Sequence, residues 1–235
     1  MINWYKKLLI SIGTITIMIV IIFTPLLFYV FNLNYYLSLY EKNRVYESID
    51  RQDAIKLTDE LIEFLKNKED FKPFILKNNL PFFTSDEISH LGDVRNLFNK
   101  IFLTYYISSG LSVVFIAALF ERKIKNYLKN ISLLLILPST LIILFLILLY
   151  FFGQNFLSLF DKFHTIFFPQ GNYAFPESST LITLLPLNFF YDFFTKLVIS
   201  SLIFAVILII SGIIILLISK KVCKNKLQDG YFEKI

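Results

Sequence analysis

The chain has 235 residues, of which 56% are hydrophobic and only 17% are charged, and its mean hydropathy is +0.63. Soluble proteins are nearer about a quarter charged, and a 27.6 kDa globule could not bury 27 Phe and 13 Tyr. The net charge of +5 does not indicate a nucleic-acid-binding protein, because the basic residues form no helical stripe or recognition motif. The single Cys223 excludes an intrachain disulfide framework and a metal site built from cysteines. These features predict a polytopic membrane protein.

Four stretches are long and apolar enough to cross roughly 30 Å of hydrocarbon as helices. They are Leu8 to Phe31, Ile101 to Phe120, Ile131 to Phe152 and Leu197 to Ile218. The first follows two lysines, but its apolar run is too long for a cleaved signal peptide, so we expect an uncleaved anchor. No Asp, Glu, Lys, Arg or His lies inside the four stretches, which argues against a proton pump or ion transporter.

The charges of the segments between these stretches predict the topology. Residues 1–7, 121–130 and 219–235 carry net charges of +2, +3 and +3, counted as Lys and Arg minus Asp and Glu. Residues 32–100 and 153–196 carry −2 and −1, and the five segments together give the total of +5. Basic residues beside membrane spans stay in the cytoplasm. We therefore expect both termini inside and both larger loops outside.

The expected fold is an all-α membrane protein with four transmembrane helices and a small, mostly helical extracytoplasmic cap. We expect five parts along the chain: a cytoplasmic N-terminus with the first transmembrane helix (1–31), the cap (32–100), the second and third transmembrane helices joined by a short basic cytoplasmic loop (101–152), an aromatic extracytoplasmic loop (153–196), and the fourth transmembrane helix with a basic cytoplasmic tail (197–235).

Local patterns predict further helices beside the spans. Apolar residues at helical spacing from Ala54 to Leu65 predict an amphipathic helix that packs on its neighbours or lies on the bilayer. Thr84 and Glu87 match a capping box, which predicts a helix that begins there and continues into the second span. The Phe-rich helical spacing from Phe156 to Phe167 predicts a short helix in the membrane interface.

The chain has only two histidines, and both fall on expected outer segments next to the membrane. His90 precedes Asp93 by one helical turn and should stand roughly 10 Å outside the apolar stretch that opens at Leu97. His164 follows Asp161 by one turn. A neighbouring carboxylate can fix the tautomer of an imidazole and support its protonated form, as acid–base catalysis requires.

Taken alone, the residues leave two interpretations of these histidines open. An isolated histidine is more often a surface or packing residue, whereas two beside one interface, each with a carboxylate, favour acid–base chemistry. Two histidines do not fill a zinc site, and no zinc-site spacing is present, so we expect no bound metal. The sequence also lacks a serine nucleophile elbow and the glycine-rich loops that bind nucleotides.

The histidine segments resemble those of a known family. Residues 87–95, EISHLGDVR, resemble the E-x-x-H-x-x-D-V-R/K segment of the bacterial lipoprotein intramolecular transacylases, the Lit family, and residues 163–168, FHTIFF, resemble its F-H-x-I/L-F-F segment. Gly171 to Tyr173, Leu181 to Pro186, Phe189-Phe190 and Asp192 follow in the family's order, so the resemblance covers nearly the whole chain.

The sequence departs from the family pattern at two positions near the second histidine segment. Thr183 stands where an Arg is common, and Leu187 stands where an acidic residue often follows the proline. These departures bear on the details of the substrate more than on the class of reaction.

The resemblance implies an acyltransferase of the bacterial plasma membrane. Such an enzyme moves the sn-2 acyl chain of a diacylglyceryl lipoprotein from the glyceryl oxygen to the α-amine of the N-terminal cysteine, giving the lyso-form. The resemblance implies no cofactor and no metal, and as partners only the lipoprotein substrate and membrane lipids, with a monomer assumed. It implies the following site residues: His90 and His164 as catalytic, and Asp93, Arg95, Asn172 and Asp192 as supporting or substrate-binding.

The chemistry predicts how these residues act. We expect His90 and His164 to approach each other across a groove open to the outer leaflet, with imidazole pKa values near the ordinary value of about 6.5 and activity falling below roughly pH 6. The alternative function is a non-enzymatic lipid-binding or sensor subunit. The two histidine motifs favour the enzyme, because a lipid-binding protein needs the Phe-rich segment but not two imidazoles.

Overall fold

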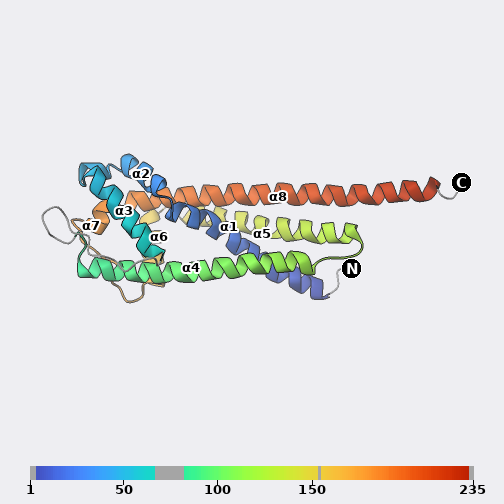
Figure 1. Cartoon of the computed structure of the whole chain (residues 1–235), viewed down its shortest axis with the longest axis horizontal. Coiled ribbons are helices and arrows are strands. Elements are labelled where there is room, and N and C mark those ends of the chain that lie inside the picture. The colour runs from blue at the N-terminus through green and yellow to red at the C-terminus, as the bar shows by residue number, and fades with distance from the viewer. Residues whose placement is uncertain (1–3, 67–81, 153–154, 233–235) are drawn as a thin grey trace. The chain divides into compact units, whose positions relative to one another are not determined.

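The structure is a computed structural model that describes residues 4–66, 82–152 and 155–232, with side chains up to residue 221. These residues form helices and connecting turns, without a β-strand in the described ranges, so the predicted all-α fold is confirmed (Figure 1). The elements are α1 (Trp4–Val30), α2 (Leu33–Lys42), the 3-10 helix η1 (Val45–Glu47), α3 (Arg51–Leu65), α4 (Ser85–Ala118), α5 (Ile124–Phe152), α6 (Phe156–Phe167), α7 (Thr180–Leu184) and α8 (Leu187–Phe232).

Four of these helices, α1, α4, α5 and α8, are long and apolar enough to cross a membrane, which confirms the four predicted spans. They leave large apolar side chains on the surface, such as Val113 of α4 at 68% exposure and Ile207 of α8 at 54%. An exposed apolar surface of this extent is covered by lipid in a membrane protein. All four helices also begin before the apolar stretches expected from the sequence, at Trp4, Ser85, Ile124 and Leu187.

The chain folds into two compact units. The first unit comprises Met1–Thr24, Thr104–Leu148 and Ile199–Ile235, and the second comprises Pro25–Leu103 and Leu149–Val198. The second unit contains α2, η1, α3, α6 and α7 together with both histidines.

In the first unit, small and hydroxylated residues let the helices approach closely. A Cβ on Gly13 of α1 would lie 2.7 Å from a side-chain atom of α5. Ser112 of α4 donates a hydrogen bond of 2.9 Å to Thr16 of α1, and both side chains are buried. At the start of α1, Lys6 forms a 2.6 Å ion pair with Glu121 in the turn between α4 and α5. Such small-residue contacts are the usual basis of helix association in lipid.

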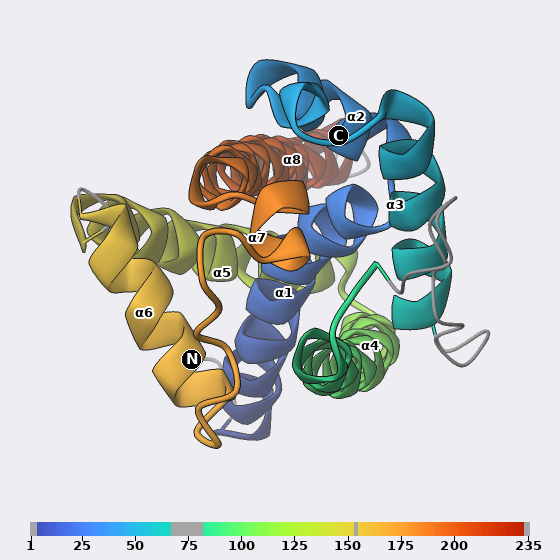
Figure 2. The ribbon, with the colours of Figure 1, turned by 90° about the vertical axis from the view of Figure 1, so that its left-hand side faces the viewer.

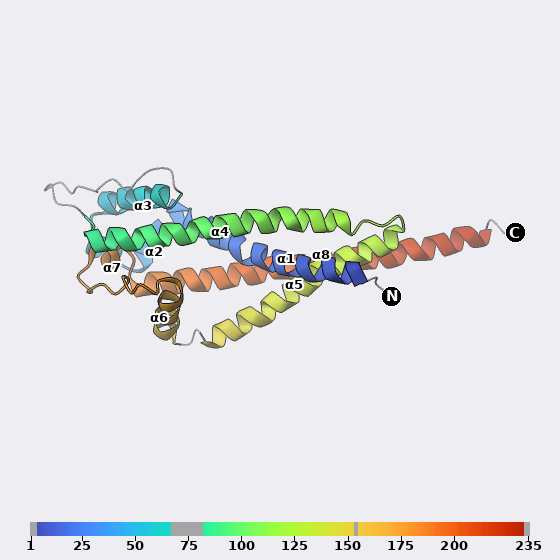
Figure 3. The same ribbon diagram turned by 90° about the horizontal axis from the view of Figure 1, so that it is seen from below.

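In the second unit, α3 packs on the other helices as its amphipathic pattern predicts. Leu57 and Leu61 are almost fully buried in the core of this unit, and Thr58 shares a 2.7 Å hydrogen bond with the buried hydroxyl of Tyr40 on α2. Asp50 caps the helix by accepting hydrogen bonds from the first backbone N–H groups. Figure 3 shows α3 alongside the N-terminal part of α4.

The two helices that carry the histidines begin at side-chain caps. At the start of α4, the Thr84 N–H donates to Glu87 Oε2 at 2.7 Å and the Glu87 N–H donates back to Thr84 Oγ1 at 3.3 Å. This confirms the predicted capping box and the continuous helix into the second span. The predicted aromatic helix is also confirmed as α6, in which Asn155 accepts a hydrogen bond from the Ser158 N–H.

Candidate active site

The structure places the two histidines side by side. His90 lies in the second turn of α4 and His164 in the last turn of α6. Their ring centroids are 6.0 Å apart with an angle of 27° between the ring planes, and the side chains are only 6% and 8% exposed. The expected approach of the two histidines is thus observed. That expectation rested on the two histidine segments, whereas local patterns place each histidine only on its own helix. At this distance, a charge on His164 disfavours the protonation of His90.

Aromatic rings enclose the histidine pair. The ring of Phe168, which is 2% exposed, lies 4.9 Å from His90 and 5.6 Å from His164, measured between centroids. Phe160 packs on His164 at 4.2 Å and Phe175 packs on His90 at 5.7 Å. These rings remove water from the imidazoles, so the interactions of the imidazoles with neighbouring charges and dipoles are stronger than in solution.

His164 has a defined tautomer. Its Nδ1 lies 2.8 Å from the backbone oxygen of Phe160. A carbonyl oxygen only accepts, so Nδ1 carries the proton and Nε2 keeps its lone pair. Asp161, which the sequence suggested for this role, influences the imidazole only through its charge. The backbone of the preceding turn therefore fixes the ring.

Burial lowers the pKa of His164 below its ordinary value, against the opposing effects of the Phe160 carbonyl and Asp161. Burial, together with the charge of His164, also lowers the pKa of His90, to about 4, so the expectation of two unperturbed imidazoles is wrong. Desolvation disfavours the charged form of the ring, and the aromatic neighbours supply that desolvation. His164 is thus a neutral proton acceptor at pH 7.

Asn172 connects Asp93 with His90. The Asn172 Nδ2 donates to Asp93 Oδ2 at 2.7 Å, and Gln170 Nε2 donates to the same oxygen at 2.8 Å. This orients the Asn172 oxygen toward His90, with which the carboxamide interacts electrostatically. Neither Asn172 Oδ1 nor His90 Nδ1 has a partner with full hydrogen-bond geometry among the described residues. Asp93 therefore holds the carboxamide that faces the imidazole.

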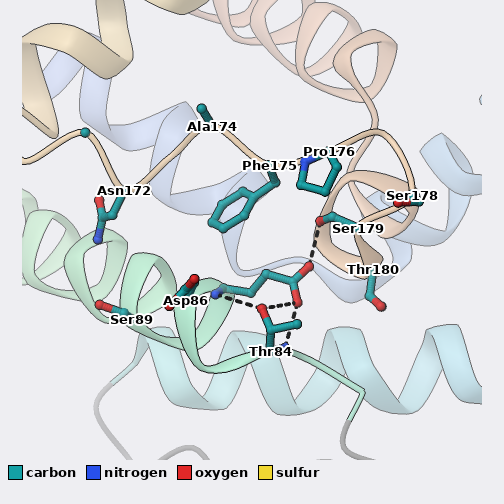
Figure 4. A pocket seen from close by; sticks show the side chains of 12 residues that line it. Thr84, Asp86, Ser89, Asn172, Ala174, Phe175, Pro176, Ser178, Ser179 and Thr180 are labelled. Carbon is teal, nitrogen blue, oxygen red and sulfur yellow. Dashed lines mark hydrogen bonds between the residues drawn. The ribbon is translucent and has the colours of Figure 1, made fainter.

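Glu87 is a buried residue of this region whose main contacts the sequence did not reveal. It is 1% exposed, and its Oε1 accepts a hydrogen bond from the Leu181 N–H at 2.8 Å and another from Ser179 Oγ at 2.6 Å, the second of which Figure 4 shows. Its Oε2 binds Thr84 at the start of α4. The capping pattern predicted the Thr84 contacts, whereas nothing local to Glu87 signals the contacts with α7. One carboxylate thus joins α4 to α7.

A cavity of about 620 Å³ lies between the first turns of α4 and the segment 171–180. Figure 2 shows this segment passing between α6 and the N-terminal end of α4. Asn172 and Phe175 line the cavity and also contact His90, so the cavity adjoins the histidine pair. Its lining consists of Thr84, Asp86, Glu87, Ser89, Gly171, Asn172, Ala174, Phe175, Pro176, Ser178, Ser179 and Thr180 (Figure 4).

Two of the expected site residues pack against other elements. The Arg95 guanidinium lies over the ring of Phe64 at 4.3 Å, which links α4 to α3. Asp192 of α8 accepts hydrogen bonds from Lys42 Nζ at 2.7 Å and from Asn43 Nδ2 at 3.0 Å, which links α8 to the end of α2. Both arrangements join helices of the second unit, and a part in substrate binding stays a prediction.

The described part of the chain contains no group of three or more His, Cys, Asp or Glu side chains that could hold a metal ion. The histidine pair can take up and release protons. The Nδ1 proton of His164 is held by the Phe160 carbonyl, and Nε2 keeps a lone pair that can accept a proton. The site therefore has the parts of an acid–base catalyst. It has a neutral imidazole, a second imidazole beside it, and a carboxylate-held amide.

Comparisons with known proteins relate the chain to a family and to solved structures. A family model described as Lipoprotein intramolecular transacylase Lit matches residues 11–190. An uncharacterized protein of Aquifex aeolicus (strain VF5) is 30% identical over 180 residues, which is 77% of each chain. The in meso structure of the membrane integral lipoprotein intramolecular transacylase Lit from Bacillus cereus covers 93% of this chain and 98% of its own, with a TM-score of 0.72 at 19% identity.

A variant of the Bacillus cereus protein, in which one histidine is replaced by arginine, has a TM-score of 0.66 at 19% identity, with 96% of this chain and 95% of that chain covered. These structures share the fold of the present chain. The family model spans most of the chain and includes both histidine segments. The chain therefore belongs to the lipoprotein intramolecular transacylase (Lit) family, as a membrane-integral transferase of lipoprotein maturation.

Proposed function

We propose that this protein moves the sn-2 acyl chain of a diacylglyceryl lipoprotein to the α-amine of its N-terminal cysteine. The observation that carries the proposal is the buried pair of His90 and His164, whose rings are 6.0 Å apart. Ester aminolysis needs a group that removes a proton from the amine and a group that returns one to the departing oxygen. Two adjacent imidazoles supply both.

The steps balance without an additional reactant. An imidazole takes a proton from the α-ammonium, whose ordinary pKa is about 8. The amine nitrogen then attacks the ester carbonyl carbon, the C–N bond forms, and the carbonyl π electrons move to the oxygen. The pair takes the second proton from the attacking nitrogen. When the tetrahedral intermediate collapses, the bond to the glyceryl oxygen breaks and this oxygen receives that proton. The first proton is released to water, so the imidazoles end neutral, as they began.

Donor and acceptor belong to one substrate molecule, so binding it brings the reacting groups together without an acyl-enzyme intermediate. The protein's part is to position the ester, to move protons, and to keep out water that would hydrolyse the ester. The aromatic rings around His90 and His164 supply that exclusion, since both side chains are less than a tenth exposed. The reaction in this form requires neither a metal nor a cofactor.

The charge distribution supports a location for this chemistry. The basic segments 1–7, 121–130 and 219–235 would lie in the cytoplasm, and the second unit's histidines would face the outer leaflet of the plasma membrane. That is where a lipoprotein carries its lipidated cysteine after signal-peptide removal. The protein would act as a monomer on a lipoprotein held in the same membrane.

The test is an assay of the purified protein in detergent with a synthetic diacylglyceryl lipopeptide. Substrate and product have equal mass, so tandem mass spectrometry must locate the acyl chain on nitrogen or on oxygen. His90→Ala and His164→Ala should each lower the rate by about 10² to 10⁴. The rate of the double variant should be little lower than that of either single variant. If the two histidines act together, removing one already removes the contribution of both.

Two controls make the assay specific. A lipopeptide with an acetylated amine should not react, because its nucleophile is gone. A chelator should leave the rate unchanged, whereas loss of activity restored by zinc would contradict a metal-free mechanism. Near-normal turnover of both alanine variants would refute the catalytic pair, and binding without any conversion would support the non-enzymatic lipid-binding alternative instead.

A further inference from the structure

From the cavity beside the histidine pair, and resting on the proposed function, we infer that this cavity binds the lipoprotein's polypeptide directly after its lipidated cysteine. We further infer that Asp86 makes the site prefer cationic over acidic side chains there. The proposed reaction concerns only the cysteine and its lipid, and it leaves open which lipoproteins react well. The cavity supplies a basis for that selectivity.

The position of the cavity fits a polypeptide that leaves the reacting centre. Asn172 and Phe175 form its border with His90, because each lines the cavity and contacts that imidazole. A substrate whose cysteine amine reaches the histidines must continue within a few ångströms of this border. Its acyl chains belong in apolar surroundings, whereas its backbone amides need hydrogen-bonding partners.

The polarity of the lining matches an extended peptide. Ser89, Ser178 and Thr180 bring hydroxyl groups to the wall, and such groups can both donate to and accept from peptide amides. Figure 4 shows these side chains and the ring of Phe175 around the opening. An opening of about 620 Å³ has room for a few residues of such a chain.

The charge of the lining determines which peptides are favoured. Glu87 is saturated by hydrogen bonds from Thr84, Ser179 and Leu181. Asp86, by contrast, is exposed in the first turn of α4 and has no ion pair among the described residues. None of the twelve residues that line the cavity is cationic. A phosphate headgroup therefore has no countercharge there, while a lysine side chain would meet the Asp86 carboxylate.

The experiment uses the full-length protein in detergent and three lipopeptides with the same diacylglyceryl-cysteine. The next residues are Ser-Lys-Lys, Ser-Ser-Ser or Ser-Asp-Asp. At low ionic strength, kcat/KM should fall in that order, by on the order of two- to fivefold for each step, as for exposed charge pairs. The differences should shrink as salt screens the charges.

Variants assign the preference to one carboxylate. Asp86→Lys should reverse the order of the three peptides. Asp86→Asn, which adds no positive charge, should remove most of the difference in kcat/KM among them. Asp59→Lys makes the same change on the exposed face of α3, away from the cavity lining, and should leave the order as it is.

The outcomes separate the two proposals. Conversion of all three peptides at equal kcat/KM, or an order unchanged by Asp86→Lys and Asp86→Asn, would overturn the peptide site while the transacylase stands. A reversal by Asp59→Lys as well would show a general surface-charge effect and also overturn it. Failure to convert any of the peptides would refute the transacylase, and the peptide site with it.

Discussion

Two influences act in opposite directions on the imidazole of His164. Burial among aromatic rings lowers its pKa, whereas the hydrogen bond to Phe160 and the charge of Asp161 raise it, and burial prevails. An imidazole accepts a proton only when neutral. Protonation of His164 should therefore reduce activity only below pH 6.5, the ordinary value.

The measurement is the pH profile of kcat/KM. The substrate amine alone should give a slope of one in the logarithmic plot below about pH 8, and His164 should add a second break below 6.5. Histidine C2-hydrogen exchange, followed by mass spectrometry, reports the pKa of this residue directly. A value above 6.5 would contradict the prediction. The free energy of unfolding should depend on pH in the same direction. His164 binds a proton more readily in the unfolded chain, so the folded protein loses stability as the pH drops below 6.5.

Asn172 should position His90 rather than react itself. Its amide group is held by Asp93 at 2.7 Å, and its oxygen faces the imidazole. Asn172→Ala should lower kcat by about tenfold to 100-fold with little change in KM, the range seen when groups that orient a functional imidazole are removed. Gln170→Ala is the matched control, because Gln170 donates to the same Asp93 oxygen from an exposed position. Equal losses in both variants would argue against a specific role for Asn172.

At the scale of elements, Glu87 should hold α4 and α7 together. Glu87→Ala removes hydrogen bonds to a carboxylate and leaves the Leu181 N–H without its acceptor, which should cost about 3 kcal/mol or more. Glu87→Gln keeps the shape and should cost less. The measurement is thermal unfolding in detergent. The control is Asp86→Asn, a substitution of the exposed neighbouring residue, which should change Tm little. A similar small change for Glu87→Ala would contradict this role.

The elements themselves were largely predictable, because their signals are local. Helical spacing located α3 and α6, and the capping box located the start of α4. The arrangement between elements was not predictable from such signals. The sequence suggested Asp161 as the partner of His164, but the Phe160 carbonyl lies at i−4, where a helical side chain reaches it directly. Likewise, the stacking of Arg95 on Phe64 depends on how α3 packs beside α4.

In the candidate site, too, local features were predictable and contacts between distant segments were not. Each histidine could be assigned to a helix near the membrane, and the family resemblance marked both. Their 6.0 Å approach results from the packing of α6 and α4, in which Asn172 binds Asp93 from a distant part of the chain. No periodicity reports a contact of that kind. The second role of Glu87 was missed for the same reason, since its partners Ser179 and Leu181 lie in a different segment.

For the molecule as a whole, the four apolar helices and the charged segments between them predict an orientation in the membrane. Residues 121–130, which include the turn between α4 and α5 and the start of α5, carry four basic residues and one acidic residue. Lys6 at the start of α1 pairs with that acidic residue, Glu121. The segment between α6 and α8 is slightly acidic. Basic segments of this length resist translocation, so this turn should face the cytoplasm and the loop that contains Glu177 should face outward.

Single cysteines can test this orientation in intact cells. Cys223→Ser removes the native thiol, and Lys123→Cys or Glu177→Cys then places a new one at an exposed position on either expected side. A maleimide that does not cross the membrane should label the Glu177→Cys protein at once, and the Lys123→Cys protein only after the cells are permeabilised. The native Cys223 should behave like Lys123→Cys, because both are expected in the cytoplasm. The opposite labelling pattern would place the histidine pair on the cytoplasmic side, where no lipoprotein with a free N-terminal cysteine would reach it.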